Sequence, residues 1–275
     1  MRYGIAVWNF REEGVPLVRL VEEFADSGFD AVSFLPGQIV QCSDGEAQEL
    51  LSLLRERDLV ATVHGNFQMA SADVETLVAR LGDRLVALTM DAAMTADSCG
   101  HFYDGQKMAH FLAEIEDATD GTPLRFGVED FPLDRLALDR YRDDLGPLLD
   151  CPRYGTLIDL GHLNLRVRQA DYFRSMTPAD YIRRVPLPII EVHVHDNKGE
   201  RDSHGPIGFG TVAFAEIAAA LREVGFDGIS TIEIAPSFHG STPAASKPRA
   251  SESLQAWRAL WEESQATAGE ATSQP

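Results

Sequence analysis

The sequence predicts a single-domain (β/α)₈ barrel, the TIM-barrel fold. Short apolar runs alternate with amphipathic helical patterns along nearly the whole chain, giving eight strand–helix units in about 250 residues. Strands separated by helices indicate a parallel sheet. A doubly wound open sheet is the competing fold. No GxGxxG motif follows the first strand, however, and the polar residues of interest end the later strands, which favours the barrel.

The predicted strands are short runs rich in apolar residues. In order they are YGIAVWNF (3–10), AVSFLP (31–36), VATVHGNF (60–67), LVALTM (85–90), RFGVEDF (125–131), YGTLIDL (154–160), PIIEVHVHD (188–196) and GISTIEI (228–234). Helical spacing is found at 15–28, 46–58, 74–82, 107–118, 133–150, 179–185, 214–225 and 251–264. We expect one catalytic domain over 1–265, followed by a flexible tail at 266–275, where the residues are small and polar.

Composition narrows the class of protein. Acidic residues outnumber basic ones 43 to 24, for a formal charge of −19, which disfavours general binding to nucleic acid. Three widely spaced cysteines indicate neither a disulfide framework nor a thiolate zinc site, and they fit a reducing cytoplasm. The N-terminus does not resemble a signal peptide, and no apolar stretch is long enough to span a membrane. We therefore expect a cytoplasmic protein without nucleic-acid or membrane partners.

Metal-capable side chains end four consecutive predicted strands. Glu129 ends the fifth, Asp159 the sixth, and Glu233 the eighth, while His193 lies near the end of the seventh. Because function in a TIM barrel gathers at the carboxyl ends of the strands, we expect these side chains to converge. Such an oxygen-rich set suits one Mn²⁺, Mg²⁺ or Co²⁺ ion, and Zn²⁺ also accepts these ligands.

One acidic strand end is more often a helix cap or an ion-pair partner than a ligand. Several together in one cavity are costly unless a cation compensates them, which favours the metal site. His195 lies on the same side of its strand as His193, and Asp202 and His204 lie in the following loop. The turn GPIGFG (205–210) lets the backbone pass close to this site.

Four segments carry a family resemblance. GVED, LIDLGHLN, EVHVHDNKGERDSHGPIGFGTVAF and STIEI together resemble the xylose isomerase-like TIM-barrel superfamily, which includes the AP endonuclease family 2 type. Its members include sugar isomerases and epimerases, inosose and dehydroshikimate dehydratases, and endonuclease IV. The resemblance to ketose epimerases implies that Glu129, Asp159, His193 and Glu233 hold one divalent metal. It also implies that His162 contacts substrate.

The resemblance to endonuclease IV widens the set. It implies that His64, Asp202 and His204 join His162 and the four ligands in a multinuclear cluster. One departure stands out: that family has a histidine after strand four, whereas this chain reads LVALTMDAAM (85–94), with Asp91 as a substitute. Together with the charge of −19, this argues against a DNA-repair nuclease. Asp202, His204, His64 and His195 are thus expected to bind a second ion or substrate hydroxyls.

The leading interpretation is an isomerase or epimerase of a sugar or a similar polyhydroxy ketone, working through a metal-stabilised enediolate. Glu129 and Glu233 would exchange the proton, and His162 would assist. Trp8 and Phe67 are expected to line an apolar wall of the pocket, and Lys198 and Arg201 to meet the substrate. Enzymes of this type often pair, so a homodimer or homotetramer is expected.

Three alternatives stay open at this stage. A dehydratase of the inosose or dehydroshikimate type shares the first step but then expels a hydroxyl group. A phosphoesterase with two or three metal ions would use basic loop residues against a phosphate. A non-catalytic binding module that kept the barrel is the third.

Overall fold

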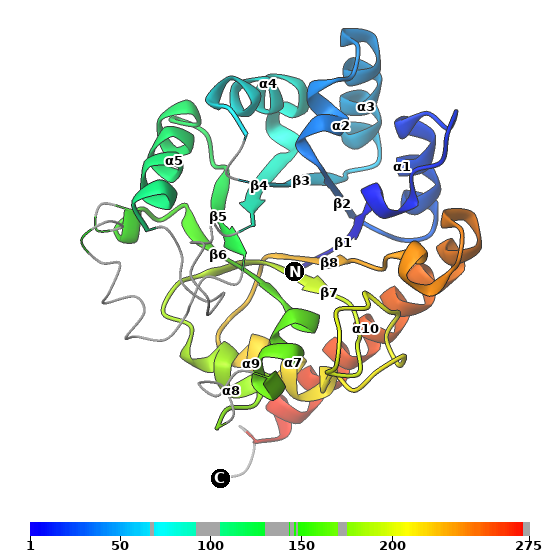
Figure 1. Ribbon diagram of the computed structural model, residues 1–275, viewed down its shortest axis with the longest axis vertical. Coiled ribbons are helices and arrows are strands. Elements are labelled where there is room, and N and C mark those ends of the chain that lie inside the picture. Colours follow the sequence, from blue (N-terminus) through cyan, green and yellow to red (C-terminus); the bar gives the residue numbers. More distant parts are fainter. Residues whose placement is uncertain are drawn as a thin grey trace.

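The computed structural model of the chain describes residues 1–66, 69–91, 105–129, 143, 146, 148–169 and 175–271. Within them eight parallel strands close into a barrel, each paired with the next along the chain and β8 paired with β1 (Figure 1). The strands are β1 (Arg2–Ala6), β2 (Ala31–Phe34), β3 (Val60–Gly65), β4 (Leu85–Met90), β5 (Arg125–Glu129), β6 (Tyr154–Asp159), β7 (Ile189–Val194) and β8 (Ile229–Ile232). The predicted TIM-barrel fold is confirmed.

The helices lie around the ring of strands (Figure 1). They are α1 (Leu17–Asp26), α2 (Pro36–Val40), α3 (Asp44–Glu56), α4 (Ser71–Leu81), α5 (Gly105–Ala118), α7 (Leu160–Gln169), α8 (Pro178–Arg184), α9 (Phe214–Glu223) and α10 (Pro243–Ala271), with 3-10 helices η1 (Val7–Phe10), η2 (Gly82–Arg84) and η4 (Pro236–His239). The helix expected over 133–150 falls mostly outside the described residues.

Local sequence explains where several helices begin. Before α3, the Ser43 hydroxyl accepts a hydrogen bond from the Glu46 backbone N–H, and the Glu46 carboxylate accepts one from the Ser43 N–H. Thr177 and Asp180 form the same reciprocal pair at the start of α8. Each pair satisfies two backbone donors that a helix start leaves free.

The first strand is shorter than predicted. It ends at Ala6, and Val7–Phe10 turns into η1. An apolar run alone does not distinguish a strand from a short buried helix, and Val7 and Phe10 are both fully buried. Trp8 therefore reaches the barrel mouth from η1 and not from a strand end.

The C-terminal segment is more helical than predicted. The last helix is predicted over 251–264, but α10 already begins at Pro243. The Thr242 hydroxyl accepts from the Ala245 N–H, and proline suits the first helical position, so this start has an ordinary cap. The helix continues to Ala271, past residue 265, where we expected the domain to end. The division into a barrel domain and a tail stays a prediction.

Helix α10 closes the outer layer over the last strand. Trp257 is completely buried, and its indole N–H donates to the Ser230 hydroxyl on β8 at 2.5 Å. Lys247 near the start of α10 forms ion pairs with Glu23 of α1 at 2.6 Å and with Glu12 at 3.2 Å. The last helix is thereby joined to the first.

A polar layer lies inside the barrel below its mouth. Ser33, Thr62, Thr89, Thr231 and Glu191 come from five different strands, and all are fully buried. Interior layers of a TIM barrel are usually built from branched apolar side chains, so this layer is an exception. Its hydroxyl groups surround the Glu191 carboxylate.

Among the residues described, no helix is both long and apolar enough to cross a membrane.

The β5–β6 contact depends on glycine. Gly127 and Gly155 are register partners, and a Cβ on Gly127 would lie 2.2 Å from the Gly155 carbonyl oxygen. We predict that Gly127→Ala lowers the free energy of unfolding by about 1–3 kcal/mol, because the two backbones must separate. Gly45→Ala in α3 is the matched control, since its Cβ would meet no atom within 4 Å and alanine favours a helix. Chemical denaturation measures both, and equal stabilities for the two variants would contradict the expected clash.

Candidate metal centre

Strand register brings the predicted ligands to one edge of the barrel. Asp159 on β6 is the register partner of His193 on β7. Glu129 is the last residue of β5, and Glu233 directly follows β8. All four residues are at least nine-tenths buried, which places them inside the mouth rather than on its rim.

Within the described residues, metal-capable atoms lie within 4.8 Å of one another in four overlapping groups. The groups are Glu129–Asp159–His193, Asp159–His195–Glu233, His64–Asp91–Glu129, and His162–His195–Asp202–His204. Glu129, Asp159 and His195 each belong to two groups. The mouth therefore holds one continuous cluster of carboxylates and imidazoles.

At the centre of the cluster lies His193. Its Nδ1 is 2.9 Å from Glu233 Oε2 and 3.9 Å from Asp159 Oδ2, and its ring is almost completely buried. Burial opposes charge on this ring, but the nearby Glu233 carboxylate and its hydrogen bond raise the pKa of His193 to about 9. Burial likewise opposes ionisation of Glu233, but His193 outweighs it and lowers the pKa of that carboxyl.

Glu129 joins two histidines from opposite sides. Its Oε1 accepts from His162 Nδ1 at 2.9 Å, and its Oε2 is 3.1 Å from His64 Nε2. Burial alone would raise the pKa of Glu129, yet these two hydrogen bonds hold it well below its usual range. His64 Nε2 is also 3.3 Å from Asp91 Oδ1. Asp91, which follows β4, thus stands beside His64 and Glu129.

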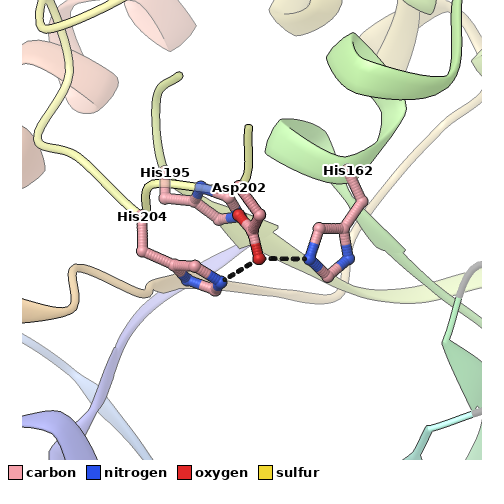
Figure 2. Close-up of side chains that lie close together, drawn as sticks. All are labelled: His162, His195, Asp202 and His204. Atoms are coloured by element: carbon pink, nitrogen blue, oxygen red, sulfur yellow. Dashed lines mark hydrogen bonds and ion pairs between the residues drawn. The ribbon is translucent and has the colours of Figure 1, made fainter. Parts of the chain in front are cut away.

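The loop after β7 completes a second side of the mouth (Figure 2). Asp202 lies between two imidazoles, with its Oδ2 2.9 Å from His204 Nε2 and 3.1 Å from His162 Nε2. The His195 ring stacks on His204 at a centroid distance of 3.9 Å. Burial would raise the pKa of Asp202, but its two histidine partners hold it well below its usual range. Burial lowers the pKa of His204, but the bond to Asp202 outweighs it and the pKa rises to about 9.

The backbone of this loop is held by Asp196. Its carboxylate accepts hydrogen bonds from the N–H groups of Gly208, Gly210 and Val212, and its own backbone pairs with Gly205 in both directions at 2.8 Å. A Cβ on Gly210 would lie 2.0 Å from the Asn197 carbonyl oxygen, so this close approach requires glycine. The close packing of the backbone at this turn is thus the reason that the sequence has a glycine there.

His204 has an unusual backbone. Its φ is +41°, in the left-handed region that most side chains avoid. Strain of this kind persists only where the surroundings impose it, and it often marks a functional position. Here it accompanies the bond from His204 Nδ1 to the Glu233 carbonyl oxygen at 3.1 Å, which leaves Nε2 directed at Asp202.

The donor set suits a divalent cation. In the described part of the chain, His193 Nε2 and His195 Nδ1 are buried without a hydrogen-bond partner. His195 Nε2 is 2.9 Å from Asp159 Oδ1, and His193 Nδ1 is 2.9 Å from Glu233 Oε2. Each of these two rings therefore directs one nitrogen at a carboxylate, while its other nitrogen has no hydrogen-bond partner. Glu129, Asp159 and His193 form one group, and Glu233 lies 2.9 Å from His193. Carboxylates and imidazoles are ligands that Mn²⁺, Mg²⁺, Co²⁺ and Zn²⁺ all accept.

The predicted substrate residues have different fates. Trp8 stacks beside His64 at a centroid distance of 6.2 Å and forms a wall next to the cluster. Arg201 lines a cavity of about 250 Å³ together with Asp202, Ser203 and Phe238. The Lys198 ammonium is exposed and lies 5.2 Å from the Phe209 ring centroid. Phe67 lies outside the described residues.

Sequence reasoning overlooked two residues of this region. Phe238 on η4 is 54% exposed and meets the His204 ring edge-on at 5.6 Å, and only its place after strand eight pointed to the mouth. Glu191 lies beneath the cluster, with its Oε1 3.8 Å from His193 Nε2. It had a readable signal, because EVHVH places Glu191, His193 and His195 on one side of a strand.

The fold and the cluster define a TIM-barrel protein with a metal-capable centre at the carboxyl end of its strands. Residues 21–260 match the xylose isomerase-like TIM barrel family, and the chain belongs to that family.

A protein of Methanocaldococcus jannaschii, the uncharacterized MJ1311, is 25% identical over 252 residues, which cover 85% of this chain and 83% of that protein. Among solved structures, a D-tagatose 3-epimerase-like protein has a TM-score of 0.72 at 19% identity, with 98% of this chain and all of that one covered. The D-psicose 3-epimerase of Clostridium cellulolyticum H10, solved with D-tagatose, has a TM-score of 0.69 at 15% identity, over 95% and 99% of the two chains. At these identities the two structures show the shared fold.

If the cluster binds a dication, the folded state gains binding energy that the unfolded chain lacks. We predict that Mn²⁺ at about 100 times its Kd raises the free energy of unfolding of the chelator-treated protein by about 2.7 kcal/mol. This corresponds to a rise in Tm on the order of 5–10 °C. Asp159→Asn should lose most of this rise, because Asp159 belongs to two of the ligand groups. Glu75→Gln, an exposed change on α4, is the control and should keep it. Differential scanning calorimetry measures all three, and an equal rise for Asp159→Asn would exclude Asp159 as a ligand.

Proposed function

We propose that the chain is a divalent-metal-dependent isomerase or epimerase of a sugar or a related polyhydroxy ketone. One observation carries the proposal: Glu129 and Glu233 approach the central Asp159–His193 pair from strands on either side of it. Two carboxylates on opposite sides of one substrate position are what removal and return of a proton require.

Glu129, Asp159, His193 and Glu233 would hold the metal, with Mn²⁺, Mg²⁺ or Co²⁺ favoured by the oxygen-rich set and Zn²⁺ accepted. When bound, the dication would polarise the substrate carbonyl and stabilise the enediolate that forms when the neighbouring carbon loses its proton. Asp159 is fully buried, so its part would be to hold the ion.

The remaining side chains handle protons and position the substrate. Glu129 and Glu233 would take the proton from one face of the reacting carbon and return it to the other. The His162 side chain is 31% exposed and donates to Glu129, so it can meet a substrate oxygen and relay a proton. Trp8 and Arg201 flank the cluster on two sides and would orient the substrate, with Lys198 further out.

The group on the β7 loop has two candidate roles within this proposal. His162, His195, Asp202 and His204 are close enough to hold a second ion, and Asp202 and His204 are also placed to bind substrate hydroxyls. His64 belongs with Asp91 and Glu129 in the same way. The pKa of His204, raised to about 9 despite burial by its bond to Asp202, means that this ring carries a proton at neutral pH. That favours a dehydratase as the first variant of the proposal, because a leaving hydroxyl group needs a proton.

A multinuclear phosphoesterase is the second candidate function. It is favoured by one specific observation, the position of Asp91 beside His64 and Glu129, where a carboxylate can complete a further ligand group. Basic residues near the mouth, such as Arg201, could then meet a phosphate.

The reaction class is tested in D₂O with Mn²⁺ and a panel of ketoses. Isomerisation or epimerisation should give a product that keeps the substrate's mass apart from one solvent deuteron, whereas dehydration should lose water; mass spectrometry separates them. Glu233→Gln should lower kcat by about 10²–10⁴-fold, because one of the two bases is lost. Glu75→Gln is again the control. A Glu233→Gln variant that turns over at the wild-type rate would remove this carboxylate from the mechanism.

Metal content separates the mononuclear from the multinuclear function. We expect plasma emission spectrometry of the purified, Mn²⁺-reconstituted chain to give about one equivalent per chain, as one central ion requires. Two or three equivalents, together with hydrolysis of a phosphodiester and no turnover of ketoses, would favour the phosphoesterase instead.

A further inference from the structure

A carboxylate is buried in the barrel interior among hydroxyl groups. The Glu191 side chain on β7 is completely inaccessible to solvent. Its Oε1 accepts hydrogen bonds from Thr231 at 2.7 Å and Thr62 at 2.9 Å, and its Oε2 accepts one from Thr89 at 3.2 Å. In the described part of the chain, no lysine or arginine forms an ion pair with it. Burying a carboxylate among neutral hydroxyl groups is costly, so a further role is expected of it.

The nearest charged or chargeable group is the ring of His193. Its Nε2 lies 3.8 Å from Glu191 Oε1 and, as noted, is buried without a hydrogen-bond partner. Its Nδ1 faces the opposite way, toward Glu233 and Asp159. A shift of less than about 1 Å would bring Nε2 and Oε1 to hydrogen-bond distance.

A second route leads from Glu191 to His64. Thr89 has one hydroxyl proton, which it donates to Glu191, so its oxygen accepts a hydrogen bond from His64 Nδ1–H at 3.1 Å. The other nitrogen of that ring, Nε2, is then left facing Glu129 and Asp91. The same carboxylate thus bears on two imidazoles of the cluster.

We propose that Glu191 is a positioning residue that sets the tautomers of both rings. After the small shift described above it accepts a hydrogen bond from His193 Nε2–H directly, and it orients the Nδ1–H of His64 through Thr89. In the metal-loaded state, the unprotonated nitrogen of each ring would then be the one that faces the mouth. The inference rests on the proposed metal site, because a neutral imidazole can bind a metal only through its unprotonated nitrogen, and a carboxylate behind the ring also raises its basicity.

Calorimetric titration of the chelator-treated protein with Mn²⁺ tests the proposal. Glu191→Gln keeps the size of the side chain but replaces a strong acceptor with an amide, and we expect it to weaken Mn²⁺ binding by about 10–100-fold. Thr62→Val is the matched control: it also removes a hydrogen bond to Glu191 but leaves the carboxylate that faces His193 in place, so its affinity should stay within about twofold of wild type. Rescue by Glu191→Asp should be poor, because the shorter chain withdraws the acceptor.

Metal affinity and thermal stability together distinguish positioning from packing. Equal Mn²⁺ affinities for folded Glu191→Gln and wild type would overturn this inference and leave the proposed function standing. A wild-type chain that binds no Mn²⁺ would overturn both. If Glu191→Gln and Thr62→Val lose equal amounts of Tm and of affinity, Glu191 acts only through packing, which also overturns it.

A measurement on the unaltered chain holds even if Glu191→Gln fails to fold. In the Zn²⁺-loaded protein labelled with ¹⁵N-histidine, long-range ¹H–¹⁵N correlation spectra report which nitrogen of each ring carries the proton. We expect Nε2–H for His193, identified by loss of its signals in His193→Gln, and Nδ1–H for His64. The reverse tautomer at His193 would contradict the proposal.

Discussion

The mouth of this barrel is organised by the compensation of buried negative charge. Glu129, Asp159 and Glu233 are all buried in a space where ionised carboxylates would repel one another and lose their hydration. Each of them has an imidazole at hydrogen-bond distance. Against the effect of burial, the neighbouring imidazoles lower the pKa of the three carboxyl groups, and the Glu233 carboxylate raises the pKa of His193. The protonated His193 ring thus contributes positive charge to the cluster. A bound dication would take over that function and release its proton.

Two kinds of support hold the cluster. Below it, hydroxyl groups from several strands surround Glu191, and every member of this layer is buried in the sheet. Above it, Asp196 fixes the loop that carries Asp202 and His204 by accepting three backbone hydrogen bonds. Rigid support matters because ligands and bases act only when held close to their working geometry. The strands thus fix the floor, and a single loop fixes one side of the opening.

Much of this arrangement follows from the sequence, and its omissions have physical reasons. Apolar runs mark the strands, and parallel strands bring their carboxyl ends to one edge. The sequence therefore predicts that Asp159 and His193 converge, and the two are register partners on β6 and β7. Trp8 was assigned to a strand end because an apolar run does not reveal that η1 turns away from the sheet. The role of Glu191 depends on hydroxyl groups from three other strands, far from it in sequence. No local pattern encodes such contacts. The two-residue alternation of the strand predicts only that Glu191 lies on the same side as His193.

The hydrogen bonds around Asp202 bear on what chemistry the cluster performs. Glu129, His162, Asp202 and His204 form one unbroken series of hydrogen bonds from the centre of the site to its edge. A lone pair that binds a metal is no longer free to accept a proton, so these side chains either relay protons or hold a second ion. In the proposed function with one central ion, the series would give a substrate oxygen access to a mobile proton, which suits enediolate chemistry. A second ion at Asp202 would close that path and make the mouth a clamp for an anion. Under the proposal, the occupancy of the loop site, more than the barrel or its central ligands, would set the reaction class.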